Sequence, residues 1–160
     1  MLYQFLRRTN MQTKKLITRT ILMTLLLTCG GLVQAEQVVI QGDHELHYNT
    51  FPSTFLSKEI ANTYQITRSK NRGILSISVM DKSGESPKAV EADITIQAKN
   101  LVHQNKDIKL IKIREQDDAI YYLGTFALNN EENVNFSIEA KPTGSDTVFL
   151  VKFTREFFTD

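Results

Sequence analysis

The sequence holds a single cysteine, Cys29, among its 160 residues, and it has no tryptophan. One cysteine excludes an intramolecular disulfide and a zinc site built from several thiolates. Residues 36–160 also carry no excess of positive charge. Five of the 19 basic residues precede Glu36, so 14 basic residues face 18 acidic residues after that point. This balance excludes the strongly basic surface of a nucleic-acid-binding protein.

Motifs of catalysis and of metal binding are also missing. The sequence contains no Gly-x-Ser-x-Gly elbow, no His-Glu-x-x-His and no glycine-rich phosphate loop. His44 and His47 would lie on opposite faces of a strand, and His103 is far from both in the sequence. We therefore expect a protein without enzymatic activity and without a bound metal or cofactor.

The first 35 residues have the three parts of a secretory signal peptide. The last basic residue is Arg19, residues 20–33 carry no charge, and Ala35 offers a small side chain to signal peptidase. We expect cleavage between Ala35 and Glu36 and a periplasmic protein. An uncharged run of 14 residues is shorter than the roughly 20 residues that span a bilayer, so we expect no stable membrane span after cleavage.

Two alternatives concern this leader. Translation could begin at Met11, because basic residues still follow it. Cys29 could carry a lipid anchor, although Thr28 is a poor residue at the position before a lipidated cysteine. If Cys29 leaves with the leader, the mature chain has no cysteine and no cysteine nucleophile.

From Glu36 onward, apolar and polar residues alternate in short runs separated by turn residues. This period of two is typical of half-buried strands. Repeated short strands with regular turns predict an all-β protein, a single antiparallel β-sandwich domain over residues 36–160. The predicted strands are 37–41, 45–51, 75–79, 93–99, 107–114, 120–128, 133–140 and 148–153.

Several segments carry more specific predictions. The apolar parity switches within 107–114, which indicates a bulge near Leu110 or a bend between sheets. The almost wholly apolar run 148–153 is typical of a central strand covered on both faces. Apolar residues at helical spacing, with Ser57 as a cap, predict one short helix over 54–64.

Aromatic residues near the core are assigned from the same parity. Tyr122 follows the apolar face of its strand and should be buried, whereas Tyr121 points the other way. Phe157 and Phe158 are expected to close the core.

Segments throughout the chain resemble a bacterial family of unknown function, DUF4426. The resemblance rests on YNTFPSTFL at 48–56, IANTY at 60–64, residues 68–70 and 73–79, AIYY at 119–122 and VKFTREFF at 151–158. It implies a small exported protein of gammaproteobacterial type with an immunoglobulin-like sandwich, for which the pattern above predicts seven or eight strands. It implies no reaction.

One dense basic stretch, residues 68–73, follows the predicted helix, and the simpler interpretation is a polar linker to the next strand. Alternating cations in an extended segment would point to one side and could hold a phosphate, a carboxylate or an acidic partner. Aromatic residues with arginine are common anchors of interfaces. The candidate binding residues are therefore Arg68, Lys70, Arg72, Tyr48, Phe55 and Tyr64.

A second candidate is acidic. Residues 115–118 and Asp146 fall in loops that would meet at one end of the sandwich and could collect calcium, whereas Glu131 and Glu132 fall at the opposite end. No Asp-x-Asp-x-Asp-Gly spacing supports this site, and a solvated acidic loop is the simpler reading.

These observations favour an exported, non-enzymatic binding or accessory module that contacts a periplasmic or envelope protein. The alternative is a periplasmic carrier of a small ligand or metal.

Overall fold

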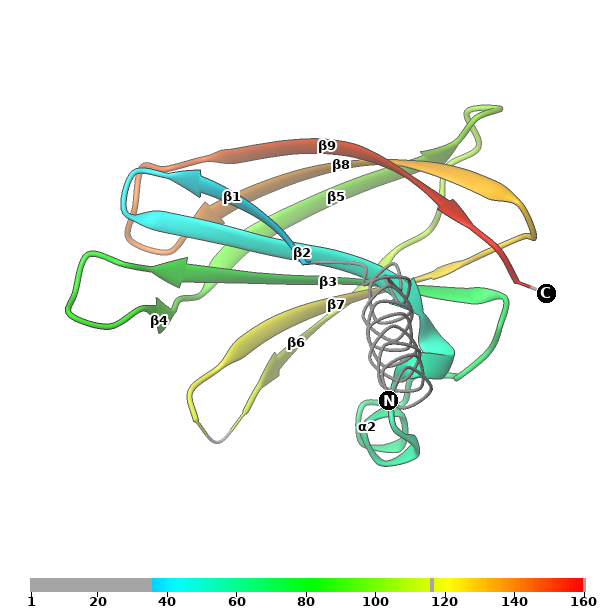
Figure 1. The fold of residues 1–160 in the computed structure, drawn as a ribbon, viewed down its shortest axis with the longest axis horizontal. Coiled ribbons are helices and arrows are strands. Elements are labelled where there is room, and N and C mark those ends of the chain that lie inside the picture. Colours follow the sequence, from blue (N-terminus) through cyan, green and yellow to red (C-terminus); the bar gives the residue numbers. More distant parts are fainter. Residues whose placement is uncertain (1–35, 116, 160) are drawn as a thin grey trace, which may run out of the picture. The chain divides into compact units, whose positions relative to one another are not determined.

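Two antiparallel sheets face each other in the computed structural model, which describes residues 36–115 and 117–159 (Figure 1). The larger sheet has the order β1-β2-β3-β7-β6, with β4 also paired to β3, and the smaller sheet has the order β5-β8-β9. The architecture confirms the predicted β-sandwich. The strands are β1 (Gln37–Gln41), β2 (His44–Pro52), β3 (Arg72–Asp81), β4 (Lys88–Ala89), β5 (Ala92–Asn100), β6 (Lys109–Arg114), β7 (Ile120–Ala127), β8 (Glu132–Pro142) and β9 (Phe149–Phe157).

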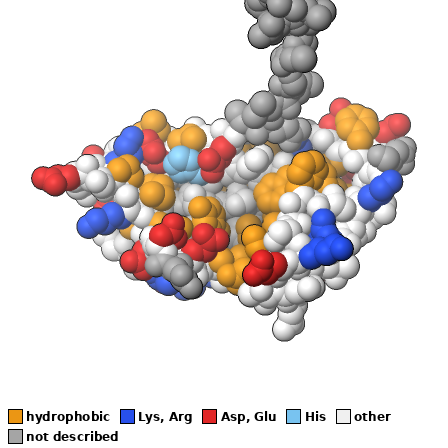
Figure 2. Space-filling model, turned by 60° about the horizontal axis from the view of Figure 1, so that its bottom comes forward, with side chains coloured by type: hydrophobic (Ala, Val, Ile, Leu, Met, Phe, Trp, Pro, Cys, Tyr) orange, Lys and Arg blue, Asp and Glu red, His pale blue; other side chains and the backbone are white. Residues whose placement is uncertain are grey.

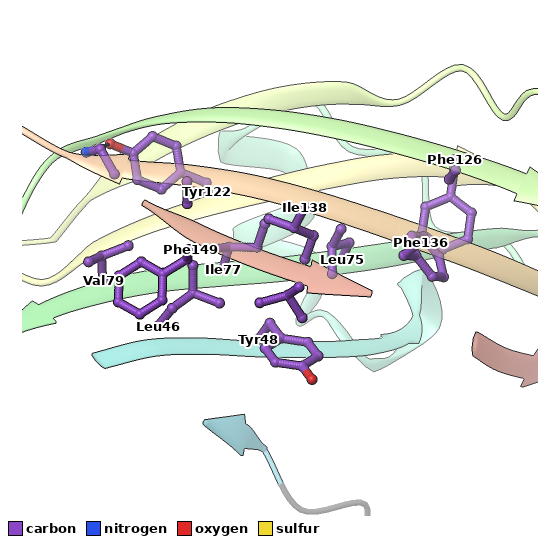
Figure 3. Close-up of a cluster of buried hydrophobic side chains, with 14 of the residues drawn as sticks. Leu46, Tyr48, Leu75, Ile77, Val79, Tyr122, Phe126, Phe136, Ile138 and Phe149 are labelled. Atoms are coloured by element: carbon purple, nitrogen blue, oxygen red, sulfur yellow. Dashed lines mark hydrogen bonds between the residues drawn. The ribbon is translucent and has the colours of Figure 1, made fainter. Parts of the chain in front are cut away.

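The main core lies between the sheets, where the alternating apolar residues of both meet (Figure 3). Phe126 and Phe136 form a T-shaped pair with ring centroids 5.3 Å apart. The buried Tyr122 hydroxyl accepts a hydrogen bond from the Ala92 amide at 2.9 Å and so joins the two sheets. Each large apolar side chain in this core stabilises the fold by about 1.5–3 kcal/mol. The fully buried members include Leu46, Leu75, Ile77, Val79, Val134 and Phe149.

A smaller apolar cluster covers the outer face of the larger sheet. Ile74, Ile113 and Leu123 are buried there, and Ile66 covers them from the segment after the helix. This second cluster corrects the prediction for 107–114. β6 pairs with β7 in unbroken register without a bulge. The apolar residues change parity because Leu110 packs against the main core, whereas Ile111 and Ile113 pack in the outer cluster.

The predicted helix over 54–64 is wrong in extent. A 3-10 turn, η1 (Ser53–Phe55), is followed by the α-helix α2 (Lys58–Thr63). The Ser57 cap is confirmed, since its hydroxyl accepts from the Ile60 amide at 3.1 Å. α2 buries only Ala61, so Ile60 of the predicted apolar stripe stays 40% exposed.

β9 is an edge strand and not the predicted central strand. It pairs only with β8, and Leu150 on its outer face is 74% exposed. The run 148–153 looks apolar on both faces because Leu150 is apolar, but single apolar side chains are common on protein surfaces. Tyr122 and Phe157 are buried as predicted and Tyr121 is exposed, but Phe158 is 64% exposed beyond the end of β9.

Predictions about the leader fall on residues 1–35, outside the described residues. They comprise the secretory signal, the start at Met11 and the lipid anchor at Cys29. Within the described part of the chain, no helix is long and apolar enough to cross a membrane.

Candidate functional site

A buried serine fixes the chain on either side of α2. The Ser53 side chain in η1 is fully buried, and its hydroxyl accepts a hydrogen bond from the Ser69 amide at 2.9 Å. The same hydroxyl lies 3.0 Å from the Ser69 carbonyl and 3.2 Å from the Thr67 carbonyl, to which it can donate. Arg68 Nη2 donates to the Thr54 carbonyl at 2.6 Å. The segment after the helix is therefore held against η1.

The three candidate cations do not share one side of an extended segment. The Arg72 amide donates to the Ser69 carbonyl at 3.2 Å, so the chain turns between these residues. Arg68 and Lys70 are exposed, whereas Arg72 opens β3 and is half-buried. Its Nε is the one buried side-chain nitrogen or oxygen in residues 36–115 and 117–159 that has no hydrogen-bond partner. The turn is the reason that the predicted alternation fails.

The candidate aromatic residues also separate. Tyr48 lies on the core-facing parity of β2 and is 8% exposed, and its ring is tilted against that of Phe153 with ring centroids 4.8 Å apart, so it is no part of a surface. Burial raises the pKa of its hydroxyl. Tyr64 is half-buried in the outer apolar cluster. Of these three candidates, Phe55 is the exposed one, with 78% of its surface accessible.

Four of the exposed side chains around α2 define the candidate site, which we call the helix-side surface: Phe55, Lys58, Arg68 and Lys70. Glu59 and Ile60 of α2 are exposed as well. Lys58 and Arg68 line one cavity of about 470 Å³ beside α2. Lys58 was not among the predicted binding residues, because the predicted helix over 54–64 gave no indication of which of its side chains would face solvent. Figure 2 shows one face of the molecule, on which hydrophobic side chains lie beside both acidic and basic ones.

The acidic residues and histidines form no metal centre in the described part of the chain, where no three His, Cys, Asp or Glu side chains cluster. His47 instead lies 3.4 Å from Glu45 and 3.7 Å from Glu36 on the outer face of the larger sheet. The hydrogen bond from Lys82 to Glu45 is the main cause of the lowered pKa of the Glu45 carboxyl. Glu132, predicted in a polar turn, is buried in an ion pair with Lys106.

Comparison with known proteins gives one strong family match. The family model described as "Domain of unknown function (DUF4426)" matches residues 39–160. The crystal structure of a DUF4426 family protein (PA0388) from Pseudomonas aeruginosa PAO1 is 33% identical, with a TM-score of 0.69, and the match covers 80% of this chain and 98% of that one.

A weaker structural match is the GAE domain of GGA2p from Saccharomyces cerevisiae. It is 11% identical with a TM-score of 0.38, over 76% of this chain and 96% of that one. A search of curated proteins finds no match.

Proposed function

This chain belongs to the DUF4426 family, and we propose that it is an exported, non-enzymatic module that binds a periplasmic or envelope protein through the helix-side surface. The observation that carries the proposal is Phe55, a phenylalanine 78% exposed beside the cations of the segment after α2. Exposed aromatic side chains with arginine are typical anchors of interfaces.

The rigidity of this surface supports the proposal. Ser53 and Arg68 hold the chain on both sides of α2, so a partner would find the surface already ordered. A preorganised surface binds with a smaller loss of conformational entropy. The exposed cations Lys58, Arg68 and Lys70 favour a partner with an acidic contact region, because opposite charges speed encounter and fix its orientation.

The test compares two exposed phenylalanines. Protein with Phe55→Ser is used to capture partners from the envelope fraction, next to wild type and to Phe158→Ser, whose side chain is 64% exposed at the far end of the chain. We expect Phe55→Ser to lose a protein that the other two retain. Equal capture by all three would contradict the proposed surface.

Export is tested by the intact mass of the wild-type protein recovered from the envelope, periplasmic and cytoplasmic fractions. A mass that begins at Glu36 is expected from cleavage of the leader. An added lipid mass on Cys29 would contradict cleavage at Ala35, and an unprocessed mass in the cytoplasm would contradict export altogether.

A small-ligand carrier is the second candidate function. It is favoured by a groove of about 510 Å³ on the outer face of the smaller sheet, away from the core.

A further inference from the structure

The groove lies over a grid of polar side chains on β5, β8 and β9. Antiparallel register sets the residues of the three strands side by side in two rows. Alternate residues of a strand share a face, so both rows point to the same side of the sheet. One row is Gln97, Ser137 and Lys152, and the next is Lys99, Asn135 and Thr154. All six line the groove.

The two lysines stand at diagonally opposite corners of this grid. Two strand spacings and two residues of rise place their Cα atoms about 10 Å apart across the sheet and about 7 Å apart along it. Side chains of a strand stand roughly perpendicular to the sheet, and in that orientation the two ammonium groups are about as far apart as the Cα atoms, so each would meet a different part of a ligand lying along the diagonal. The arrangement fits an extended ligand with an acidic group near each end.

The chemistry between the lysines is uncharged and rich in hydrogen-bonding groups. Gln97 and Ser137 offer amide and hydroxyl groups, and Thr154 donates to Asn135 Oδ1 at 2.6 Å. No carboxylate lines the groove. The nearest acids on this face, Glu139 and Glu156, lie one row outside the grid on either side. The charged side chains that line the groove are therefore all basic.

A buried network fixes one wall of the groove. Asn100 and His103, which line it, belong to the end of β5 and the loop that follows. Asn100 Nδ2 lies 3.3 Å from Glu132 Oε1 and donates to it, and Asn100 Oδ1 accepts from the Gln104 amide at 2.9 Å. The Glu132 carboxylate also binds Lys106 on the far side of the loop. The wall is thus formed before any ligand arrives.

We propose that this groove binds an acidic saccharide, with Lys99 and Lys152 pairing its acidic groups and the amide and hydroxyl side chains between them bonding its hydroxyls. Charge complementarity selects the acid, and the amide and hydroxyl side chains select the polyol over a simple anion. This site lies on the other sheet from the helix-side surface, so either proposal can fail without the other.

The experiment is a titration of the protein, produced from the full-length sequence, with trigalacturonate, with the neutral maltotriose and with inorganic phosphate. We expect trigalacturonate to bind at roughly millimolar concentration or below, more tightly than either control, and less tightly as salt increases. Lys99→Gln with Lys152→Gln should weaken binding by about tenfold, since each exposed ion pair contributes modestly.

Lys141→Gln is the matched control, because Lys141 is an exposed lysine on the same face of β8 outside the groove. It should bind trigalacturonate as wild type does. The proposal is overturned if trigalacturonate does not bind, if maltotriose or phosphate binds equally well, or if Lys141→Gln weakens binding as much as the double variant.

Discussion

Lys106 and Glu132 form a buried ion pair, with Nζ 2.6 Å from Oε2 and side chains 10% and 7% exposed. The pair joins the loop between β5 and β6 to the first residue of β8. The Asn129 amide also donates to this carboxylate at 2.9 Å. Burial by itself would raise the pKa of Glu132, but the hydrogen bonds from Lys106, Asn129 and Asn100, with the charge of Lys106, lower it below its ordinary value.

The lowered pKa predicts loss of stability in acid. A carboxyl whose pKa is depressed in the folded state contributes stability that is complete above its unfolded pKa, about 4.3, and is lost as the pH falls through the folded value. Urea unfolding at pH 7 and at pH 3 should therefore show a smaller decrease in the free energy of unfolding for Glu132→Gln than for wild type. An identical decrease in both would contradict this account.

Removing the carboxylate altogether should be more damaging. Glu132→Ala leaves the Lys106 ammonium buried without its partner, and we expect a loss of about 3–5 kcal/mol in the free energy of unfolding at pH 7. The neighbouring Glu131 is exposed, so Glu131→Ala should change stability by less than about 0.5 kcal/mol. Comparable losses in the two variants would rule out a special role for the ion pair.

Ser53→Ala should loosen the chain after α2. The Ser69 amide would lose its acceptor, and we expect a loss of about 1–3 kcal/mol in the free energy of unfolding and faster hydrogen exchange at that amide. Ser86→Ala, in an exposed loop, serves as control. Unchanged exchange at Ser69 would show that Ser53 does not order the helix-side surface.

Gly73→Ala tests the fit of the core beside this surface. A Cβ at Gly73 would lie 2.5 Å from the Phe126 ring, so the ring must shift, and we expect a loss of about 1–3 kcal/mol in unfolding free energy. Gly84→Ala is the control, because the nearest atom to its added Cβ is 3.9 Å away. Equal melting temperatures of the two variants in thermal unfolding would contradict this packing.

Arg72→Met should not destabilise the protein. Methionine keeps an apolar stem and removes a buried Nε that has no partner, so the free energy of unfolding should stay the same or rise. A loss of more than about 1 kcal/mol in chemical denaturation would show that the guanidinium supports the fold.

Period-two patterns predicted most strands, because each half-buried strand repeats the same in-and-out order. Patterns failed where one strand serves two apolar layers. In the sequence, Ile111 and Ile113 interrupt the alternation of apolar and polar residues. In the structure, both pack in the outer cluster on the larger sheet. Leu150 was predicted to be buried because it stands in an apolar run, but it is exposed on an edge strand, and the sequence pattern does not distinguish the two cases.

Side-chain sites were harder to predict than strands, because they depend on which strands become neighbours. Tyr48 is a predicted binding residue, but its parity matches that of the core residue Leu46, and it is buried. The pairing of Lys106 with Glu132, 26 residues apart, follows from register and loop path, and no local motif marks it. The sites of Phe55 and Arg68 could be anticipated because they are close in sequence to the helix that presents them.

Photo-cross-linking in living cells shows whether the proposed helix-side surface contacts a protein. A photoreactive amino acid is placed at position 55 and, in a separate strain, at position 158, since both side chains are exposed. We expect one discrete adduct from position 55 that Lys70→Glu weakens, and none of that mass from position 158. No adduct at position 55, or the same adduct from both positions, would contradict the proposed contact.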